Sequence, residues 1–184
     1  MKTSILVASM VMMATIGLGQ KLFPTLWKTG KSKIILGHEI LREQGNGRSS
    51  PYIYFESYEQ KLADLEKKAS VQMWAEEDKK QKIESLTKYG KGGSIGVKIV
   101  ASSLDEAKVD NFTMIVQDMD GKELYRSKLK GEVPSYSVVS GSTSWGSFAV
   151  EYLPENIKTP FRLYLVNSYY SDEKYSKVVY LIKK

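Results

Sequence analysis

The sequence contains no cysteine and a single histidine, and these two shortages exclude several kinds of chemistry. Without cysteine, the chain forms no disulfide and offers no thiolate to a metal or to a covalent intermediate. His38 is the only side chain available as the base of a histidine-dependent nucleophile. It lies in an apolar stretch, so we interpret it as a packed residue, and nothing near it has the spacing of a zinc site.

Other motifs of catalysis and cofactor binding are also absent from the sequence. The glycines between 90 and 96 do not end in Gly-Lys-Ser/Thr, and they follow a predicted helix, whereas a phosphate-binding loop follows a strand. The 21 acidic residues contain no spacing that singles out one pair for glycoside hydrolysis. We therefore expect a protein that is not an enzyme and uses no cofactor.

Long apolar runs are missing, except for one near the N-terminus. Lys2 precedes an apolar stretch at 5–18, and Gly19 follows it. A short basic region, an apolar core of about 7–15 residues and small residues at the boundary are typical of a secretory signal peptide. A bilayer span needs about 20 residues. We expect a signal peptide at 1–19, a linker at 20–32 and no stable membrane span after cleavage; a retained anchor is the alternative.

Strong positive charge is missing as well. The formal charge is +6, and removal of Lys2 with the leader leaves 26 basic and 21 acidic residues. The lysines are spread along the chain and no basic run is interleaved with aromatic residues, so we expect no nucleic-acid partner. Export without cysteine fits a bacterial envelope, and the expected location is periplasmic, secreted or cell-surface.

The C-terminal half contains period-two alternation of apolar and polar residues, which is typical of half-buried strands. Turn-forming residues separate these segments, among them Asp120 and Gly121, which favour a hairpin. Strands are predicted at 33–42, 95–101, 112–117, 122–129, 136–139, 148–152, 161–165 and 178–182. Because no helical pattern lies between the later strands, we expect one domain at 33–184, an antiparallel β-sandwich of the immunoglobulin-like class.

One helical segment interrupts this pattern after the early strand. Ser57 occupies an N-cap position, and Gly90 follows the last helical residues. We predict one long helix at about 57–88, within an insertion at 56–90, packed across one face or end of the sheet. Its middle, 76–82, carries no apolar stripe, so a break into two helices or a projecting turn is an alternative; a lid or a partner-binding arm is a further one.

Aromatic residues in predicted loops are the strongest indication of a binding surface. Tyr169, Tyr170 and Tyr175 fall in or beside the predicted loop at 167–174, and Trp145 falls in the one at 140–147. A ring in a loop exposes apolar area unless it packs or makes a contact. These four residues are the candidate binding site, although Trp145 packed under its own loop is a simpler explanation for that ring.

Asp118 and Asp120 are the only candidates for a metal site that the motifs offer. They place carboxylates on alternate residues, as at the start of a calcium loop, but the remaining ligands are missing. A hairpin turn explains both residues. A second acidic stretch, with Asp105, Glu106 and Asp110, would support a metal site only if it converged on the first.

From these observations we expect an exported, non-enzymatic protein that binds another protein or an envelope component. The alternative is a carbohydrate-binding module that stacks the same loop rings on sugar faces.

Overall fold

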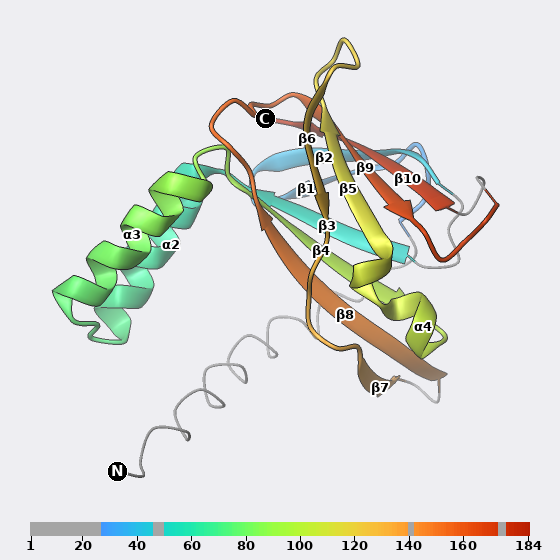
Figure 1. Cartoon of the computed structure of the whole chain (residues 1–184), viewed down its shortest axis with the longest axis horizontal. Coiled ribbons are helices and arrows are strands. Elements are labelled where there is room, and N and C mark those ends of the chain that lie inside the picture. The colour runs from blue at the N-terminus through green and yellow to red at the C-terminus, as the bar shows by residue number, and fades with distance from the viewer. Residues whose placement is uncertain (1–26, 46–49, 140–141, 173–175) are drawn as a thin grey trace.

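The computed structural model describes residues 27–45, 50–139, 142–172 and 176–184, and within these ranges the protein is mainly β. Its strands form two antiparallel sheets, one of six strands and one of four (Figure 1). The six-stranded sheet runs in the order β1 (Ser32–Ile35), β2 (His38–Gln44), β10 (Lys177–Lys183), β9 (Phe161–Asn167), β5 (Phe112–Gln117) and β6 (Glu123–Lys128). The four-stranded sheet runs in the order β3 (Ser50–Glu56), β4 (Ser94–Ala101), β8 (Ser142–Tyr152) and β7 (Ser135–Val139).

The two sheets share one apolar core because each buries alternate side chains on its inner face. Strands β5 and β9 show this alternation along their whole length. The rings of Phe55 on β3 and Phe161 on β9 meet with their centres 5.5 Å apart. The hydroxyl of Tyr180 on β10 donates to the carbonyl oxygen of Pro51 on β3 at 2.6 Å. The predictions of a mainly β chain and of antiparallel pairing are confirmed.

The prediction of one continuous strand at 33–42 is wrong, because the structure contains a hairpin there. Leu36 and Gly37 have φ of 52° and 78°, and Ile35 pairs with His38 across the two-residue turn. A turn with two positive φ values matches the twist of the strands on either side. His38 then packs in the core with its ring 4.7 Å from that of Phe55.

The predicted single helix at 57–88 is also wrong. The structure has two helices, α2 (Tyr58–Val71) and α3 (Glu76–Tyr89), with a break at 72–75 where Met73 has φ of 49°. The acidic residues that open α3 favour a helix start at this position because they face its positive dipole end. The predicted N-cap, Ser57, is confirmed, since its side chain accepts a hydrogen bond from the amide of Gln60.

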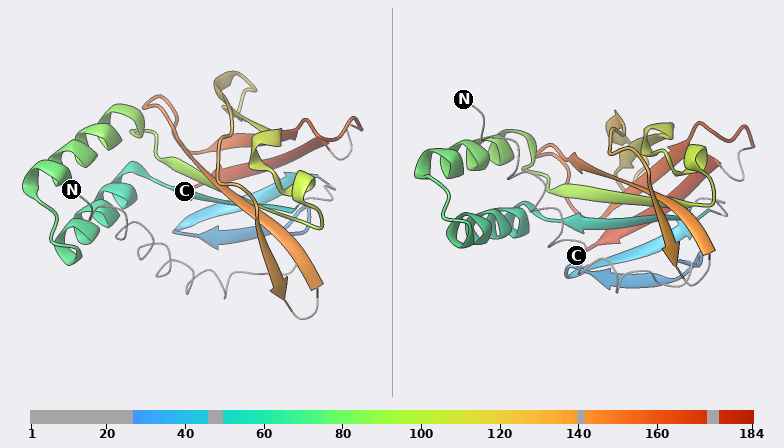
Figure 2. Two further views of the ribbon diagram at one scale, coloured as in Figure 1. Left: turned by 60° about the horizontal axis from the view of Figure 1, so that its bottom comes forward. Right: turned by 90° about the horizontal axis from the view of Figure 1, so that it is seen from below.

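We call this helical hairpin, residues 58–89, the arm. Its two helices pack against each other and extend away from both sheets, as two further views also show (Figures 1 and 2). The expectation of a helix packed across a face or an end of the sheet is therefore wrong. The helices contain little apolar surface, with Ala69 and Leu86 as their buried residues. That amount is enough to join two helices but not to cover a sheet.

The base of the arm is tied to the sheets by short contacts. The hydroxyls of Tyr58 and Thr87 lie 2.9 Å apart and join the two helices. Beyond α3, the amide of Gly92 donates to the carbonyl oxygen of Leu153 at 2.9 Å. The amide of Leu153 in turn donates to the carbonyl oxygen of Gly93 at 2.9 Å. These bonds position α3 beside the end of β8.

A short helix, α4 (Leu104–Ala107), and a 3-10 turn, η2 (Val109–Asn111), connect the two sheets between β4 and β5. Ser103 caps α4 by accepting a hydrogen bond from the amide of Glu106 at 3.3 Å. The segment lies at the opposite end of the sheets from the arm (Figure 1). It contains the second acidic stretch that the sequence indicated.

Candidate functional site

The predicted loop tyrosines lie beside the α4–η2 segment. The rings of Tyr169 and Tyr170 meet edge to face, 5.2 Å apart, and Tyr169 is half exposed. The hydroxyl of Tyr170 donates to the Glu106 carboxylate at 3.0 Å. Since that bond ties Tyr170 to α4, Tyr169 is the ring that remains available for a ligand at this end. Tyr175 lies outside the described residues.

Trp145 lies in a strand, because β8 begins at Ser142 and contains most of the predicted loop at 140–147. Its ring meets the ring of Tyr136 on β7 with centres 5.2 Å apart. Ser147, two residues further along β8, donates to the carbonyl oxygen of Ala107 in α4. Ser147 and Tyr170 thus attach β8 and the tyrosine loop to the same α4–η2 segment.

Asp118 and Asp120 form the hairpin turn between β5 and β6. One oxygen of Asp118 accepts from the amides of Asp120 at 3.0 Å and Lys122 at 2.9 Å. Gly121 has φ of 87°, as such a turn requires. The second acidic stretch precedes β5 and this turn follows it, so the two lie at opposite ends of that strand. No group of metal-ligating side chains occurs among the described residues.

The tip of the arm exposes apolar side chains that the sequence analysis did not single out. Val71 is 72% exposed and Met73 is 89% exposed. The Trp74 ring lies beside them, with its nitrogen donating to the Gln72 side chain at 2.8 Å. We call residues 71–75 the arm tip. Exposed apolar residues gathered at the end of a projecting element are typical of a contact surface.

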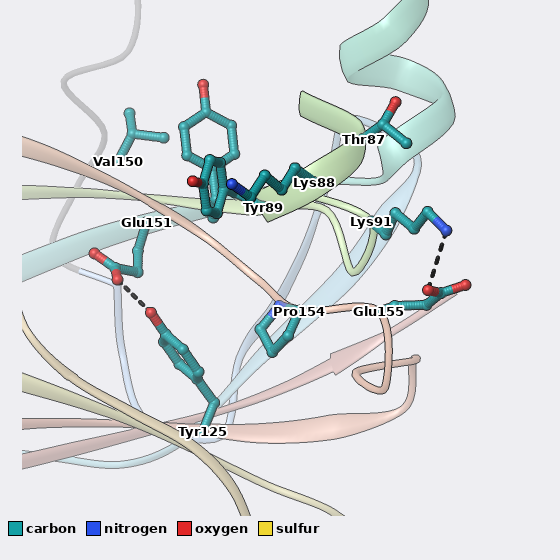
Figure 3. A pocket seen from close by; sticks show the side chains of 10 residues that line it. Thr87, Lys88, Tyr89, Lys91, Tyr125, Val150, Glu151, Pro154 and Glu155 are labelled. Carbon is teal, nitrogen blue, oxygen red and sulfur yellow. Dashed lines mark hydrogen bonds and ion pairs between the residues drawn. The ribbon is translucent and has the colours of Figure 1, made fainter. Parts of the chain in front are cut away.

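A wide hollow of the described surface lies at the base of the arm. It has a volume of about 750 Å³ and is bounded by the end of α3, by the end of β8 and by Tyr125 of β6 (Figure 3). A second hollow, of about 460 Å³, follows the seam between α2 and α3. Tyr89 and Tyr152 line both, so the two hollows are neighbours, and we treat them as one surface region. We call it the hairpin groove.

Aromatic rings and lysines together line the hairpin groove. Trp74 lies near its outer end, and the Lys82 nitrogen is 5.0 Å from the centre of that ring. The Lys88 nitrogen is 4.9 Å from the ring of Tyr89 (Figure 3). The hydrogen bond and the charge interaction with Tyr89 raise the pKa of Lys88. The rings therefore lie where they can contact a ligand together with positive charge.

Two carboxylates of the groove have partners within the protein. Lys91 and Glu155 form an ion pair at 3.1 Å, and Glu151 accepts a hydrogen bond from the Tyr125 hydroxyl at 2.5 Å (Figure 3). Burial, and then the bond to Glu151, raise the pKa of Tyr125 to about 12. Tyr125 thus holds the Glu151 carboxylate at the floor of the groove as a neutral donor.

The raised pKa of Tyr125 predicts a loss of stability in alkali. Burial also raises the pKa of Tyr54 to about 12. Both groups stay neutral in the folded chain and ionise near pH 10 once it unfolds. The stability that this difference supplies is complete below about pH 10 and is lost as the pH rises toward 12. The urea midpoint should fall between pH 9 and pH 11.

Substitution separates the contribution of Tyr125 from the other groups that titrate in that range. The Tyr125→Phe variant should lose less stability between pH 9 and pH 11 than the parent, because it has no phenol to ionise. Tyr136→Phe, at an exposed ring, makes the same chemical change and should follow the parent. An identical pH dependence in all three proteins would contradict the assignment.

Sequence reasoning missed the four aromatic residues of the groove, Trp74, Tyr89, Tyr125 and Tyr152. A signal existed for Tyr89 and Tyr152, because each is a large ring at the end of a helix or strand. Tyr89 is followed by Gly90, and the Tyr152 ring lies against that glycine: a Cβ added there would come within 3.0 Å of the ring. No local pattern indicates that these two rings line the same groove.

A scan against protein-family models, a search of curated proteins and a search of solved structures found no match to this chain. Among the helices of the described residues, none combines the length and the apolar character that crossing a membrane requires. The function proposed below therefore depends on the sequence and the geometry of this chain.

Proposed function

We propose that this protein is an exported, non-enzymatic binding protein that uses the arm to contact another protein or a component of the cell envelope. The observation that carries the proposal is the exposure of Val71 and Met73 at the tip of an arm whose two helices pack on each other and project from the sheets (Figure 1). An exposed methionine adapts to varied apolar surfaces because its side chain is unbranched and flexible.

Further support comes from the way the arm is anchored. Hydrogen bonds and the ion pair between Glu56 and Lys61 tie its base to the strands, so the tip is presented at a defined distance from the sheets. A rigid presenting element loses less conformational entropy on binding than a loose one does.

The fold class that goes with this proposal is a β-sandwich of the immunoglobulin-like class. Two antiparallel sheets with one shared core support the sandwich. In such proteins the connecting segments carry recognition while the sheets supply the scaffold. The arm is one of these connecting segments, enlarged between β3 and β4.

A photo-cross-linking residue placed at Met73 should join the arm to one discrete partner in intact cells of the native host. The matched control is the same residue at Val133, a loop position that is 86% exposed. A third variant places it at Tyr169, which tests the loop end that the sequence favoured. A discrete product at Met73 and none at Val133 is expected; products at Tyr169 alone would assign the contact to the loop end instead.

Export gives a separate prediction about the mature chain. Signal peptidase should cleave after Gly19, since small residues at the boundary are what the enzyme selects. Intact mass measurement of protein recovered from the cell envelope or the medium should then give a chain that starts at Gln20. Recovery from the cytosol with Met1 to Gly19 still present would contradict export.

A carbohydrate-binding role is the second candidate, and the observation in its favour is the row of rings in the hairpin groove. Tyr89 and Tyr152 are both exposed to a large extent and line both hollows. Ring faces along an open depression suit the flat apolar faces of sugars.

A further inference from the structure

We infer that the hairpin groove is a binding site for an anionic polysaccharide, a chain of sugars that carries carboxylate, sulfate or phosphate groups. The inference rests on the proposed export, because such polymers lie outside the cytoplasm. It assigns the groove a ligand of its own, distinct from the partner that the arm tip contacts. The rings of Tyr89, Tyr152 and Trp74 contact sugar faces, and lysines beside them pair with the anionic groups.

The first argument for this inference is the charge of the groove. Lys61 and Lys91 are neutralised by Glu56 and Glu155. The other three lysines of the groove, Lys68, Lys82 and Lys88, form no ion pair with any carboxylate of the described residues.

Against these three cations stand two carboxylates, those of Asp64 and Glu151, since Glu151 keeps its negative charge while it accepts a hydrogen bond from the neutral Tyr125. The groove therefore keeps an excess of positive charge, and it favours a ligand that brings negative charge of its own.

The placement of the lysines carries the second step. The nitrogens of Lys82 and Lys88 lie 5.0 Å and 4.9 Å from the centres of the Trp74 and Tyr89 rings. A ligand that contacts either ring thus meets an ammonium group at the same point. Alternating stacking and charge contacts match a chain of anionic sugars, in which apolar ring faces and charged substituents recur together.

The shape of the groove carries the third step. Its two hollows, of about 750 and 460 Å³, share Tyr89 and Tyr152 as lining residues, and both are open to solvent. An open depression of this size accommodates several sugar units of a longer chain. An acidic peptide would pair with the lysines but would leave the rings without flat partners. A nucleic acid fits less well because no arginine, the residue that nucleic-acid sites use for phosphate, lines the groove.

Calorimetric titration of the purified protein tests the site with defined polymers. Polygalacturonate supplies carboxylates, dextran sulfate supplies sulfates and unmodified dextran supplies neither. We expect at least one anionic polymer to bind at least tenfold more tightly than dextran, and the stronger of the two identifies the anionic group. Equal binding of dextran, or no binding of either anionic polymer, would overturn the inference. So would tighter binding of poly-glutamate or oligothymidine, which represent the other two anionic classes.

Variants distinguish the groove from the general basicity of the chain. Combined replacement of Lys68, Lys82 and Lys88 by glutamine should weaken binding at least tenfold and make it less sensitive to salt. The matched control replaces Lys31, Lys128 and Lys130, which are exposed outside the groove, and should change the affinity less than threefold. An equal loss in the control would show that the polymer adheres by net charge, and would overturn the inference.

Replacement of the two shared rings tests stacking separately. The Tyr89→Ala/Tyr152→Ala variant should also bind at least tenfold more weakly, with a melting temperature close to that of the parent. Unchanged binding would overturn the role of the rings. Neither set of variants alters Met73, so the cross-link at the arm tip should persist in both. Failure of glycan binding and failure of the proposed arm contact therefore give different results.

Discussion

Alanine in place of Trp27 is expected to lower the free energy of unfolding by about 3 to 5 kcal/mol, the range for removal of a large buried ring. Trp27 is 2% exposed, and its ring centre lies 5.4 Å from that of Tyr180. Its indole nitrogen donates to the carbonyl oxygen of Lys31 at 3.0 Å. Urea denaturation of parent and variant measures the difference.

Trp74→Ala is the matched control because it makes the same chemical change at the arm tip. Trp74 packs beside Lys82 and lies outside the core, so its loss should cost less than about 1 kcal/mol. Equal losses in the two variants would contradict the burial of Trp27. Trp27 falls in the segment 20–32, which the sequence analysis expected to be a linker, yet in the structure Trp27 packs within the core.

The Trp27 backbone also determines how a buried cation is held. The guanidinium of Arg42 donates to the carbonyl oxygens of Trp27 at 2.5 Å and Gly45 at 2.9 Å. Arg42 is 4% exposed. A buried charge is costly unless it is hydrogen-bonded. Because the carbonyl oxygen of Trp27 supplies one of these hydrogen bonds, the chain before β1 must pack closely on β2, which carries Arg42.

Alanine in place of Gly92 is expected to lower the free energy of unfolding by about 3 kcal/mol, at the upper end of the cost of overpacking. An added Cβ would lie 2.1 Å from the carbonyl oxygen of Pro154 and 3.0 Å from that of Leu153. Both are backbone atoms, and the bond from the Gly92 amide to Leu153 holds them in place. In the variant, residue 92 must therefore move away from Leu153 and Pro154 at the base of the arm.

Gly121→Ala is the comparison for this variant. A Cβ at Gly121 meets nothing within 4 Å, but the residue has φ of 87°, so the expected cost is about 1 to 2 kcal/mol from the backbone alone. Hydrogen exchange of the Leu153 amide should accelerate in the Gly92 variant and stay unchanged in the Gly121 variant. An unchanged Leu153 amide in both would contradict the close contact at the arm base.

Most strands were predictable because alternation is a local property of the chain. The residues of β5 and β9 bury every second side chain toward the core, as their apolar pattern indicates. The hairpin at 118–121 was predictable for the same reason, since Asp118 and Gly121 form the turn through neighbouring backbone groups.

The errors arose where local pattern and global packing favour different outcomes. Ile34, Ile35 and Leu36 form an apolar run that conceals the turn at Leu36 and Gly37. Serine and threonine before Trp145 are typical of loops, but pairing with β4 and β7 makes this segment a strand.

The candidate site was predictable only in part. Tyr169 and Tyr170 do lie together at one end of the sheets, next to Glu106. The hairpin groove was not predictable, because Tyr89 and Tyr152 come from distant segments that the bonds of Gly92 and Gly93 to Leu153 bring together.

By itself, the amino-acid sequence determined most of the segments that become strands, where the helical region starts at Ser57 and where it ends before Gly90. Alternation, capping and glycine conformation act between near neighbours, so they need no knowledge of the fold. Only the tertiary structure decided the order of strands in the two sheets, the projection of the arm and the meeting of rings and lysines in the groove. These depend on which faces exclude water together, and that choice involves residues far apart along the chain.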